Sequence, residues 1–412
     1  MFKKDISTCT ALLLDSGGGW NNSVESSYTH FGVPSHSFYS KGYDVIFTKP
    51  HFSVSENADP FAVLEDFLSQ GYFAIGYIGY EYSKFTQEGF YPRRKKEGVE
   101  IPDVYFLIFN GDEIDTGSIE ELLYKKEELS IRDPLKCMMS FTPNMSKDDY
   151  LNSVKAAKLY IERGDIYQVN LSQRFSTQFG SNPLDLFLKL FCVQPVPFGC
   201  YINFGEFQIL SGSMELFLRK IGSRITTRPI KGTRPRGSVA ELDHMLRNEL
   251  ITSEKERSEN LMIVDLMRND LSRICKDGTV TVKVLFSIES YSTIHQMVSE
   301  IEAQLSTGVK ARDIIENTFP PGSVTGAPKR RAIELIDMIE PHLRGPYCGA
   351  IGLFKPDGDL TLSVAIRILL INRGVATFWV GGGIVWDSDP EKEYIETLIK
   401  AQAIKEAMIA VC

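Results

Sequence analysis

The first candidate for chemistry is an amine whose neighbours constrain its backbone. Lys231 lies between Pro229, which restricts φ, and Gly232, which lets a ligand approach the chain closely. Repulsion from nearby cations would lower the pKa of this lysine, and a neutral amine is a nucleophile. Those cations are Arg228, Arg234 and Arg236. A solvated basic loop is the alternative interpretation of the same residues.

Two pairs of glutamates with helical spacing are candidates for a metal site. Glu256 and Glu259 are three residues apart, as are Glu393 and Glu396. On a helix, both carboxylates of such a pair project from one face. Two pairs on separate helices would make an oxygen-rich site for Mg²⁺, which takes a few carboxylates and keeps several waters. For each pair taken alone, ordinary ion pairs on a solvent face are the alternative.

Three further features would receive an anionic ligand. The segment 318–329 carries hydroxyls and glycines and runs into a helix predicted to begin at Pro328, where backbone N–H groups can bind an anion. Gly381–Gly383 follow a predicted strand and offer bare backbone, although such a triplet is more often a tight turn. Arg367 stands in an apolar strand and needs an anionic partner if it is buried. Together these donors predict a dicarboxylate or larger polyacid ligand.

Two single residues are more ambiguous. His295 would transfer a proton or contact the ligand, or else be a hydrogen-bonded structural histidine. Glu215 precedes the apolar Leu216 and Phe217 at a predicted strand end. An exposed turn residue is the alternative for Glu215, and spacing does not decide between the two.

Composition limits the class of protein. The 412 residues, 43% of them hydrophobic, can bury a large core, and a net charge of -8 gives no reason to expect nucleic acid or an anionic membrane as partner. The seven cysteines are scattered without C-x-x-C spacing, which argues against disulfides or zinc. The sequence lacks a signal-peptide pattern and an apolar run of membrane-spanning length. We therefore expect a cytoplasmic protein.

The elements that must position these residues form one large α/β unit, with sheets covered by helices. Ser146 should cap a helix over 147–163 that ends at Gly164, whereas 113–133 is polar and predicts a flexible connection. Strands are expected at 72–80, 104–109, 168–175, 199–203, 207–211, 279–285, 347–354, 361–371 and 375–381. Helices are expected at 240–250, 253–272, 311–317, 328–340 and 390–410.

Several long motifs in order resemble the chorismate-utilising enzymes, the family of anthranilate synthase component I, aminodeoxychorismate synthase component I, and the isochorismate and salicylate synthases. These motifs cover residues 164–169, 229–237, 261–271, 320–329 and 381–400. The resemblance implies a single chorismate-binding fold of two packed, mainly antiparallel sheets with helices outside. It divides the chain into an N-terminal part, 1–140, and a catalytic region, 146–410. The implied ligand, chorismate, is a ring with two carboxylates.

The resemblance also implies roles for individual residues. The two glutamate pairs would hold Mg²⁺, some through water, and His295 would lie near the ring. Glu215 would be the general acid that helps the C4 hydroxyl leave, and burial against Leu216 and Phe217 would raise its pKa for that task. The substrate and its carboxylates would be held by Gln168, Gly232, Thr233, Thr325, Tyr347, Arg367, Gly382, Gly383 and Lys400.

Two positions separate the members of this family. Gln168 stands where the water-adding enzymes carry a lysine base, which argues against isochorismate and salicylate synthesis. Lys231 stands where anthranilate synthases carry alanine and matches the aminodeoxychorismate synthases, so the resemblance implies amination of chorismate at C4. Lys231 would attack C2 and form a covalent adduct, or only position the substrate. The segment Arg234–Gly237 resembles the anthranilate branch, which is the alternative; a silent chorismate-binding subunit is a second one.

The resemblance extends to regulation and partners. The segment ending in Asp15 and Ser16 is similar to the tryptophan-binding segment of anthranilate synthases, although the three glycines that follow are unusual. No cysteine lies in a Gly-x-Cys-x-Gly elbow, so ammonia would come from solution or from a separate glutamine amidotransferase subunit. The chain offers no room for a lyase after the helix with Lys400. A separate lyase would therefore make 4-aminobenzoate, on the way to folate.

Overall fold

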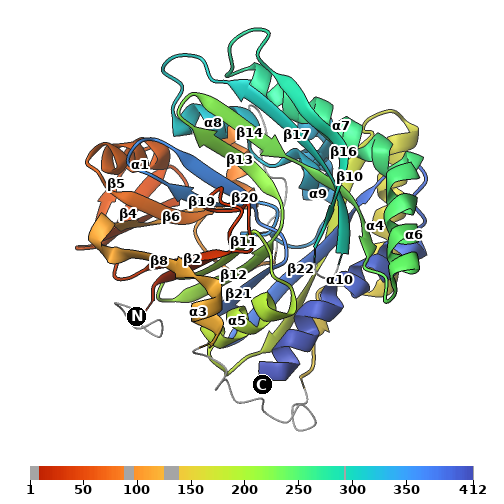
Figure 1. The fold of residues 1–412 in the computed structure, drawn as a ribbon, viewed down its shortest axis with the longest axis horizontal. Coiled ribbons are helices and arrows are strands. Elements are labelled where there is room, and N and C mark those ends of the chain that lie inside the picture. Colours follow the sequence, from red (N-terminus) through yellow and green to blue (C-terminus); the bar gives the residue numbers. More distant parts are fainter. Residues whose placement is uncertain (1–8, 88–96, 125–138, 292–293, 412) are drawn as a thin grey trace.

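Two large sheets form the centre of the molecule (Figure 1). The computed structural model describes residues 9–87, 97–124, 139–291 and 294–411. The sheets contain ten and twelve strands, and all pairs between these strands are antiparallel. The expected architecture of two mainly antiparallel sheets with helices outside is thus confirmed.

The ten-stranded sheet runs in the order β18, β10, β22, β21, β12, β11, β1, β2, β8, with β9 paired to β10. Its strands are β1 (Ala11–Asp15), β2 (Ser27–Phe31), β8 (Ile114–Ser118), β9 (Thr142–Pro143), β10 (Gln168–Gln178), β11 (Phe198–Asn203), β12 (Phe207–Ser213), β18 (Gly326–Ala327), β21 (Ile368–Asn372) and β22 (Val375–Ile384).

The twelve-stranded sheet runs in the order β15, β17, β14, β13, β20, β19, β6, β7, β3, β4, β5, with β16 paired to β17. Its strands are β3 (His36–Lys41), β4 (Asp44–Lys49), β5 (Ser53–Ser55), β6 (Phe73–Ile78), β7 (Val104–Phe109), β13 (Leu216–Ile221), β14 (Arg224–Arg228), β15 (Ile230–Pro235), β16 (Thr281–Ser290), β17 (Ile294–Gln304), β19 (Ala350–Phe354) and β20 (Leu360–Val364).

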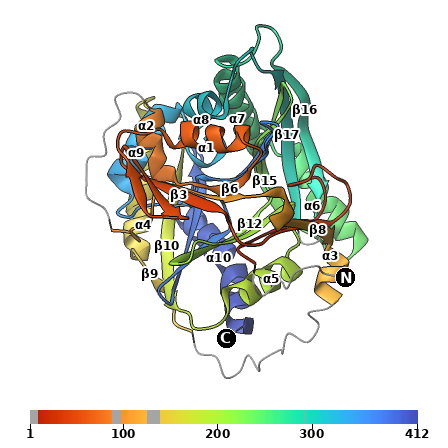
Figure 2. The ribbon, with the colours of Figure 1, turned by 90° about the vertical axis from the view of Figure 1, so that its left-hand side faces the viewer.

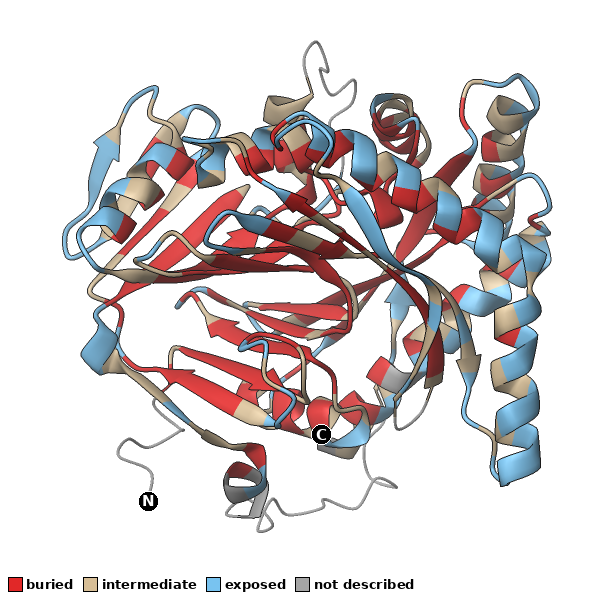
Figure 3. Ribbon diagram, turned by 45° about the horizontal axis from the view of Figure 1, so that its top comes forward, coloured by how far each residue is buried: buried red, intermediate tan, exposed pale blue. Residues whose placement is uncertain are grey.

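Helices cover the outer faces of the sheets, and their exposed sides surround the buried strands (Figure 3). None of the helices in the described ranges is long and apolar enough to cross a membrane. The α-helices are α1 (Pro60–Ser69), α2 (Ser83–Thr86), α3 (Ile119–Tyr124), α4 (Lys147–Glu162), α5 (Pro183–Val193), α6 (Ala240–Thr252), α7 (Glu254–Ser272), α8 (Ala311–Thr318), α9 (Lys329–Ile339) and α10 (Pro390–Val411); the 3-10 turns are η2 (Tyr80–Tyr82), η3 (Gly111–Glu113) and η5 (Gly322–Val324).

The main core lies between the two sheets and draws on both halves of the chain (Figure 2). The ring of Tyr77 on β6 meets that of Phe204, just after β11, at a centroid distance of 5.4 Å. Early strands also pair with late ones, because β6 lies beside β19 and β1 beside β11. The chain is therefore interlaced, and segments far apart in sequence meet in the same core.

The capping prediction for α4 is confirmed. The Ser146 hydroxyl accepts a hydrogen bond from the Asp149 N–H at 3.1 Å, and the Asp149 carboxylate accepts one from the Ser146 N–H at 3.1 Å. This reciprocal arrangement satisfies two N–H groups that the first helical turn leaves unpaired. Gly164, with φ of 78°, follows the helix as expected, because only glycine adopts this conformation without strain.

Three sequence predictions are wrong. The polar segment 113–133 contains β8 and α3, with 125–138 outside the described residues. The expected strand 361–371 is two strands, β20 and β21, which belong to different sheets; Arg367 lies in the crossing between them, with φ of 51°. The helix predicted to begin at Pro328 begins one residue later, because Pro328 is its N-cap. The sequence patterns also did not reveal β13, β14, β15, β17 or α5.

Candidate active site

Lys231 lies in a strand and not in a loop. It belongs to β15, and the pairing of β15 with β17 shifts register between Ile230 and Thr233. Lys231 and Gly232 are the two residues of this bulge, and Gly232 has a φ of 83° that favours glycine. Bulges re-aim side chains beside active sites. Here the bulge turns the lysine towards β10 and β22, since a Cβ on Gly383 would lie 3.4 Å from Lys231 Nζ.

The pKa of Lys231 is lowered, as predicted, but the cause differs from the predicted one. Burial is the largest contribution, and the Lys400 ammonium acts in the same direction, while Glu259 and Glu215 oppose it. The three arginines are instead engaged with carboxylates of their own. Arg228 pairs with Glu289 and Glu300, Arg234 with Glu249 and Glu256, and Arg236 with Asp243. Removal of the amine from water, more than repulsion from neighbouring cations, is what favours the neutral form.

Glu215 is buried at the point where the chain passes from β12 in one sheet to β13 in the other. Burial raises its pKa to about 7, against the effects of a hydrogen bond with Ser323, the charge of Lys231 and the N–H of Ile230. The prediction of a raised pKa is confirmed, and the alternative of an exposed turn residue is wrong. A carboxyl that is still protonated near neutral pH can act as a general acid.

The glycine triplet 381–383 continues β22 and is not a turn. Added Cβ atoms at these positions would meet three different groups. A Cβ on Gly381 would lie 2.9 Å from the Tyr347 hydroxyl, and one on Gly382 would lie 3.2 Å from Glu393 Oε2. One on Gly383 would lie 2.6 Å from Gln168 Nε2. Because side chains alternate between the two faces of a strand, the bare strand leaves room for the phenol and the amide on one face and for a metal-site carboxylate on the other.

Gln168 is fully buried at the start of β10, and neither its amide nitrogen nor its amide oxygen has a hydrogen-bond partner among the described residues. Leaving a buried amide unpaired costs about 1–3 kcal/mol per group. Its amide lies beside Gly383 and the Lys231 amine. A polar ligand in this place would provide the missing partners, which agrees with the expected role of Gln168 in binding substrate.

The two glutamate pairs lie on α7 and α10, and their charges influence each other. Burial raises the pKa of Glu259, and the carboxylates of Glu256 and Glu393 act in the same direction. Burial also raises the pKa of Glu393, with a further contribution from Glu396. For Glu396 burial acts the same way, but Lys400, whose Nζ is 2.7 Å from its Oε1, lowers the pKa overall.

The donor set of these glutamates fits a hard divalent cation. All its ligand atoms are carboxylate oxygens, and a cation would relieve the mutual repulsion that raises two of the pKa values. Gly382 leaves open the space beside Glu393 and Glu396 that a side chain would fill. Among the described residues, the carboxylates do not form a finished cluster of three or more ligands. Water would therefore have to complete the shell, as magnesium sites commonly allow.

Tyr347 and Arg367 lie together on the opposite side of the triplet from the glutamates. Burial raises the pKa of Tyr347, whose ring stacks on Trp379 with an interplanar angle of 6°. Burial lowers the pKa of Arg367, and the Tyr347 phenol is its nearest ionisable influence. Within the described ranges, no hydrogen bond or ion pair neutralises the Arg367 guanidinium, which remains able to bind a carboxylate.

Other predicted site residues already have internal partners. The Thr325 hydroxyl donates to the Pro321 carbonyl at 2.8 Å, and Lys400 Nζ donates to the Gly381 carbonyl at 2.8 Å. Thr233 is exposed and pairs with Gln296 across the strands. His295 is buried with both ring nitrogens engaged, Nδ1 with Ser290 Oγ at 2.7 Å and Nε2 with Asp243 Oδ1 at 2.9 Å. These contacts favour the structural interpretation of His295 over a position beside the Lys231 amine.

Asp15 and Ser16 lie at a separate pocket. The buried Asp15 carboxylate accepts hydrogen bonds from the N–H groups of Gly17, Gly19 and Asn21 at 2.9–3.0 Å, and so shapes the glycine-rich turn. Ser16 lines a pocket of about 460 Å³ together with Met214, Ile230, Tyr291 and others. Met214 and Ile230 directly precede Glu215 and Lys231 in the chain.

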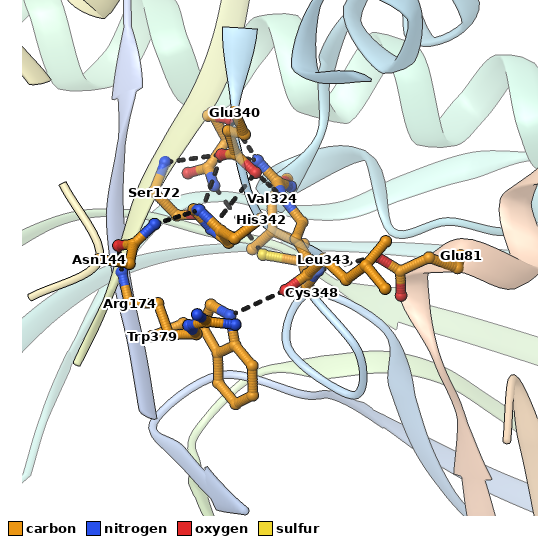
Figure 4. Close-up of polar contacts among 12 residues, drawn as sticks. Glu81, Asn144, Ser172, Arg174, Val324, Glu340, His342, Leu343, Cys348 and Trp379 are labelled. Atoms are coloured by element: carbon orange, nitrogen blue, oxygen red, sulfur yellow. Dashed lines mark hydrogen bonds and ion pairs between the residues drawn. The ribbon is translucent and has the colours of Figure 1, made fainter. Parts of the chain in front are cut away.

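A buried ion pair behind the triplet was not foreseen (Figure 4). Arg344 Nε and Nη2 donate to the two oxygens of Glu340 at 2.9 and 2.7 Å. The same guanidinium donates to the carbonyls of Asn170 at 2.6 Å and Val324 at 3.2 Å. The guanidinium therefore links Asn170 on β10, two residues after Gln168, to Val324, the residue before Thr325. No sequence pattern predicted this pair, because only tertiary burial reveals its role.

Arg344→Met is expected to lower the free energy of unfolding by about 3–5 kcal/mol, because it leaves the Glu340 carboxylate buried without its counter-ion. Denaturant unfolding followed by circular dichroism measures this change. Arg330→Met is the matched control, since Arg330 is exposed and its ion pair with Glu334 spans 3.5 Å. A loss from Arg344→Met no larger than that of the control would contradict the assigned role.

The chain is similar to known proteins in sequence and in fold. The sequence profile of chorismate binding enzymes matches residues 10–406. Aminodeoxychorismate synthase component 1 of Bacillus subtilis is 37% identical over 361 residues, covering 81% of this chain and 76% of that protein. Anthranilate synthase component 1 of Pseudomonas putida is 32% identical, covering 92% of this chain and 87% of its own. The crystal structure of anthranilate synthase component I from Streptococcus pneumoniae superposes with a TM-score of 0.76 at 28% identity, over 92% of both chains.

Proposed function

We propose, from the premise that this chain belongs to the family of chorismate binding enzymes, that it is component I of an aminodeoxychorismate synthase. In this function it converts chorismate and ammonia to 4-amino-4-deoxychorismate. The observation that carries the proposal is the bulge in β15, which turns a partly buried lysine with a lowered pKa towards Gly383 and Gln168. The similarity to the Bacillus subtilis aminodeoxychorismate synthase component 1 supports it.

The proposed reaction consists of two allylic displacements. The neutral Lys231 amine attacks C2 of the ring, the double bond shifts, and the C4–O bond breaks. Glu215 gives its proton to the departing oxygen, which leaves as water, and Glu215 becomes a carboxylate. Ammonia then attacks C4, the double bond shifts back, and the C2–N bond breaks with its electron pair on the Lys231 nitrogen. The proton that the new C4 ammonium releases returns to Glu215, which restores the acid. A single attack by ammonia would instead place nitrogen at C2, so the lysine selects the product.

The remaining residues bind and orient the substrate in this proposal. The Arg367 guanidinium, which has no counter-ion in the part of the chain that the structure describes, binds one carboxylate with the Tyr347 hydroxyl. Gln168 supplies its unpaired amide to the substrate or to ammonia. Thr325 and Lys400 bind the substrate after they release the Pro321 and Gly381 carbonyls, to which they now donate hydrogen bonds. The absence of side chains at Gly232, Gly382 and Gly383 leaves room for the ring to approach.

Mg²⁺ is proposed as the cofactor, held by Glu256, Glu259, Glu393 and Glu396 with water. When bound, it would neutralise a substrate carboxylate. Without it, four carboxylates on α7 and α10 would repel the dianionic substrate. The charges of Lys255 and Lys400 compensate them only in part, since Lys255 Nζ is 3.9 Å from Glu259 and Lys400 Nζ is 2.7 Å from Glu396.

Glu393→Gln is expected to weaken Mg²⁺ binding by roughly tenfold or more, because it removes one unit of negative charge from the site. Isothermal titration, or competition against Mn²⁺ followed by electron paramagnetic resonance, measures this without turnover. Glu391→Gln is the matched control on the same helix, since Glu391 is exposed and pairs with Lys147 at 2.7 Å. Equal Mg²⁺ affinities for the two variants would place the metal elsewhere.

The proposed partners follow from the function. Ammonia comes from solution or from a separate glutamine amidotransferase subunit, as the designation component 1 of the relatives suggests. A separate lyase then forms 4-aminobenzoate for folate synthesis. The pocket beside Ser16 is the proposed place for tryptophan, should this chain bind it as the resemblance of that segment implies.

Anthranilate synthesis is the second candidate, favoured by the relatives named anthranilate synthase component 1. A product assay separates the two. The chain is incubated with chorismate, Mg²⁺ and ammonium, a 4-amino-4-deoxychorismate lyase is added, and the aromatic product is identified by chromatography. If the proposal is correct, 4-aminobenzoate forms, and it forms only after the lyase has been added. Formation of 2-aminobenzoate without the lyase would establish the alternative, and binding of chorismate without turnover would favour a silent subunit.

A further inference from the structure

One oxygen of each glutamate in the proposed metal site already has a partner within the chain. Glu393 Oε1 accepts a hydrogen bond from the Ser388 hydroxyl at 2.7 Å. The corresponding partners of the other three carboxylates are cations: Lys400 Nζ lies 2.7 Å from Glu396 Oε1, Arg234 Nη1 lies 3.3 Å from Glu256 Oε1, and Lys255 Nζ lies 3.9 Å from Glu259 Oε1. Of these four partners, Ser388 is the neutral one.

The second oxygens of two of these carboxylates face positions without a side chain. A Cβ on Gly382 would lie 3.2 Å from Glu393 Oε2, and one on Gly232 would lie 3.0 Å from Glu256 Oε2. The two carboxylates therefore offer a cation single oxygens and do not chelate it. This arrangement suits Mg²⁺, which keeps several waters and takes few carboxylate oxygens, whereas Ca²⁺ takes more ligands and commonly both oxygens of a carboxylate.

The Ser388 hydroxyl is oriented towards Glu393 by the turn that contains it. Its oxygen accepts the Val385 N–H at 3.1 Å, which leaves the hydroxyl hydrogen for the carboxylate. The Ser388 N–H donates to the Val385 carbonyl at 3.1 Å, and the Ser388 carbonyl accepts a hydrogen bond from Lys158 Nζ, on α4, at 2.6 Å. Ser388 and Glu393 are 2% and 6% exposed, so this hydrogen bond is largely shielded from water.

We propose that Ser388 is a positioning residue of the metal site, which keeps Glu393 a one-oxygen ligand and so makes the site prefer Mg²⁺ to Ca²⁺. This inference rests on the proposed Mg²⁺ site and not on the identity of the product. With Oε1 held by the hydroxyl, Glu393 binds the cation through Oε2 alone. Because Ser388 is neutral, its replacement removes this hydrogen bond without changing the charge of the site. The effect of geometry can therefore be measured apart from the effect of charge.

Ser388→Ala is expected to weaken Mg²⁺ binding by roughly tenfold, which is typical when a metal ligand loses the hydrogen bond that orients it. The same change releases Glu393 Oε1, so both oxygens become able to bind Ca²⁺, and the Ca²⁺ affinity should stay constant or increase. The ratio of the Ca²⁺ and Mg²⁺ dissociation constants therefore falls by roughly tenfold or more. Ser388→Thr keeps the hydroxyl and should retain the wild-type ratio.

Ser272→Ala is the matched control for this variant. Ser272 is exposed at the end of α7, the helix that carries Glu256 and Glu259, and its hydroxyl donates to the Asn269 carbonyl at 2.7 Å. Its replacement likewise removes one serine hydroxyl, but at a distance from the carboxylates of the site. It should change neither dissociation constant.

Displacement of bound Mn²⁺ by Mg²⁺ and by Ca²⁺, followed by electron paramagnetic resonance, gives both dissociation constants without chorismate or turnover. If the inference is correct, the ratio falls in Ser388→Ala and returns in Ser388→Thr. Damage to the fold would weaken both cations equally. An unchanged ratio in Ser388→Ala, with or without such weakening, would overturn the inference and leave the metal site in place. Wild-type protein that binds no Mg²⁺ would instead contradict the metal site and the inference together.

Discussion

Lys231→Ala is expected to slow the amination of chorismate at C4 by roughly a thousandfold or more, because it removes the nucleophile of the first displacement. Any residual amination should place nitrogen at C2, since ammonia would then attack the ring directly. Chorismate consumption and the regiochemistry of the product, measured with saturating ammonium and Mg²⁺, check both expectations. Lys231 lies at a bulge in β15, a strand at the end of its sheet, so we expect the fold to persist.

Lys283→Ala is the matched control for this variant. Lys283 is on β16, its side chain is 49% exposed, and its contact with Glu302 spans 3.8 Å. Its replacement should leave both rate and product unchanged. If Lys231→Ala retained rapid formation of the C4 product, the lysine would not be the nucleophile, and β15 would serve only to position the substrate.

Glu215→Gln is expected to lower turnover by about 10²–10⁴-fold, because the amide has no acidic proton to give. The same change should stabilise the protein above neutral pH. Burial raises the folded-state pKa of Glu215 from 4.5 to about 7, so between these values the unfolded chain releases a proton that the folded chain retains. Wild-type stability therefore falls across this window, by up to about 3 kcal/mol in total. Glutamine does not ionise and avoids that loss.

Unfolding free energies of wild type and Glu215→Gln, measured from pH 4.5 to pH 8, check this sign. The difference should be small at the acid end, grow towards pH 7 and then remain constant. Glu206→Gln, an exposed residue in the turn between β11 and β12, should show no such trend. If the stability gain were largest at low pH, Glu215 would be a paired carboxylate and not a neutral acid. Gain of stability with loss of activity is typical of strained active sites.

Much of the fold was readable from the sequence where local signals agree with the tertiary structure. The helix α4 has its cap at Ser146 and its stop at Gly164, and the helices α7 and α10 carry the glutamate pairs at the expected spacing. Alternating apolar residues likewise predicted β10 and β12. In each of these helices and strands, the residues that signal the element lie in a single continuous segment.

The prediction of secondary structure failed in segments whose residues have a low propensity for strands but line the proposed site. The segment around Lys231 has prolines, glycine and arginines, which are poor strand formers, yet it forms β15 because β17 pairs with it and the arginines find carboxylates on neighbouring elements. The triplet 381–383 looked like a turn because glycine is rare in strands. It is a strand because the groups around it need the space that side chains would occupy.

Pairings that depend on the tertiary fold were also invisible in the sequence. Arg344 and Glu340 form a buried ion pair that no sequence pattern predicted. Arg367 was assigned to one strand because the apolar run is continuous, while the chain crosses there from one sheet to the other.

The most direct test of the account is to locate the covalent adduct. The wild-type chain is incubated with chorismate and Mg²⁺ without ammonia, quenched in acid, digested and mapped by tandem mass spectrometry, with Lys231→Ala treated in parallel. We predict an added mass of chorismate less one water on Lys231, absent from the variant and discharged as 4-amino-4-deoxychorismate when ammonium is added before quenching. An unmodified Lys231 in a preparation that forms the C4 product, or an adduct that persists in Lys231→Ala, would contradict the account.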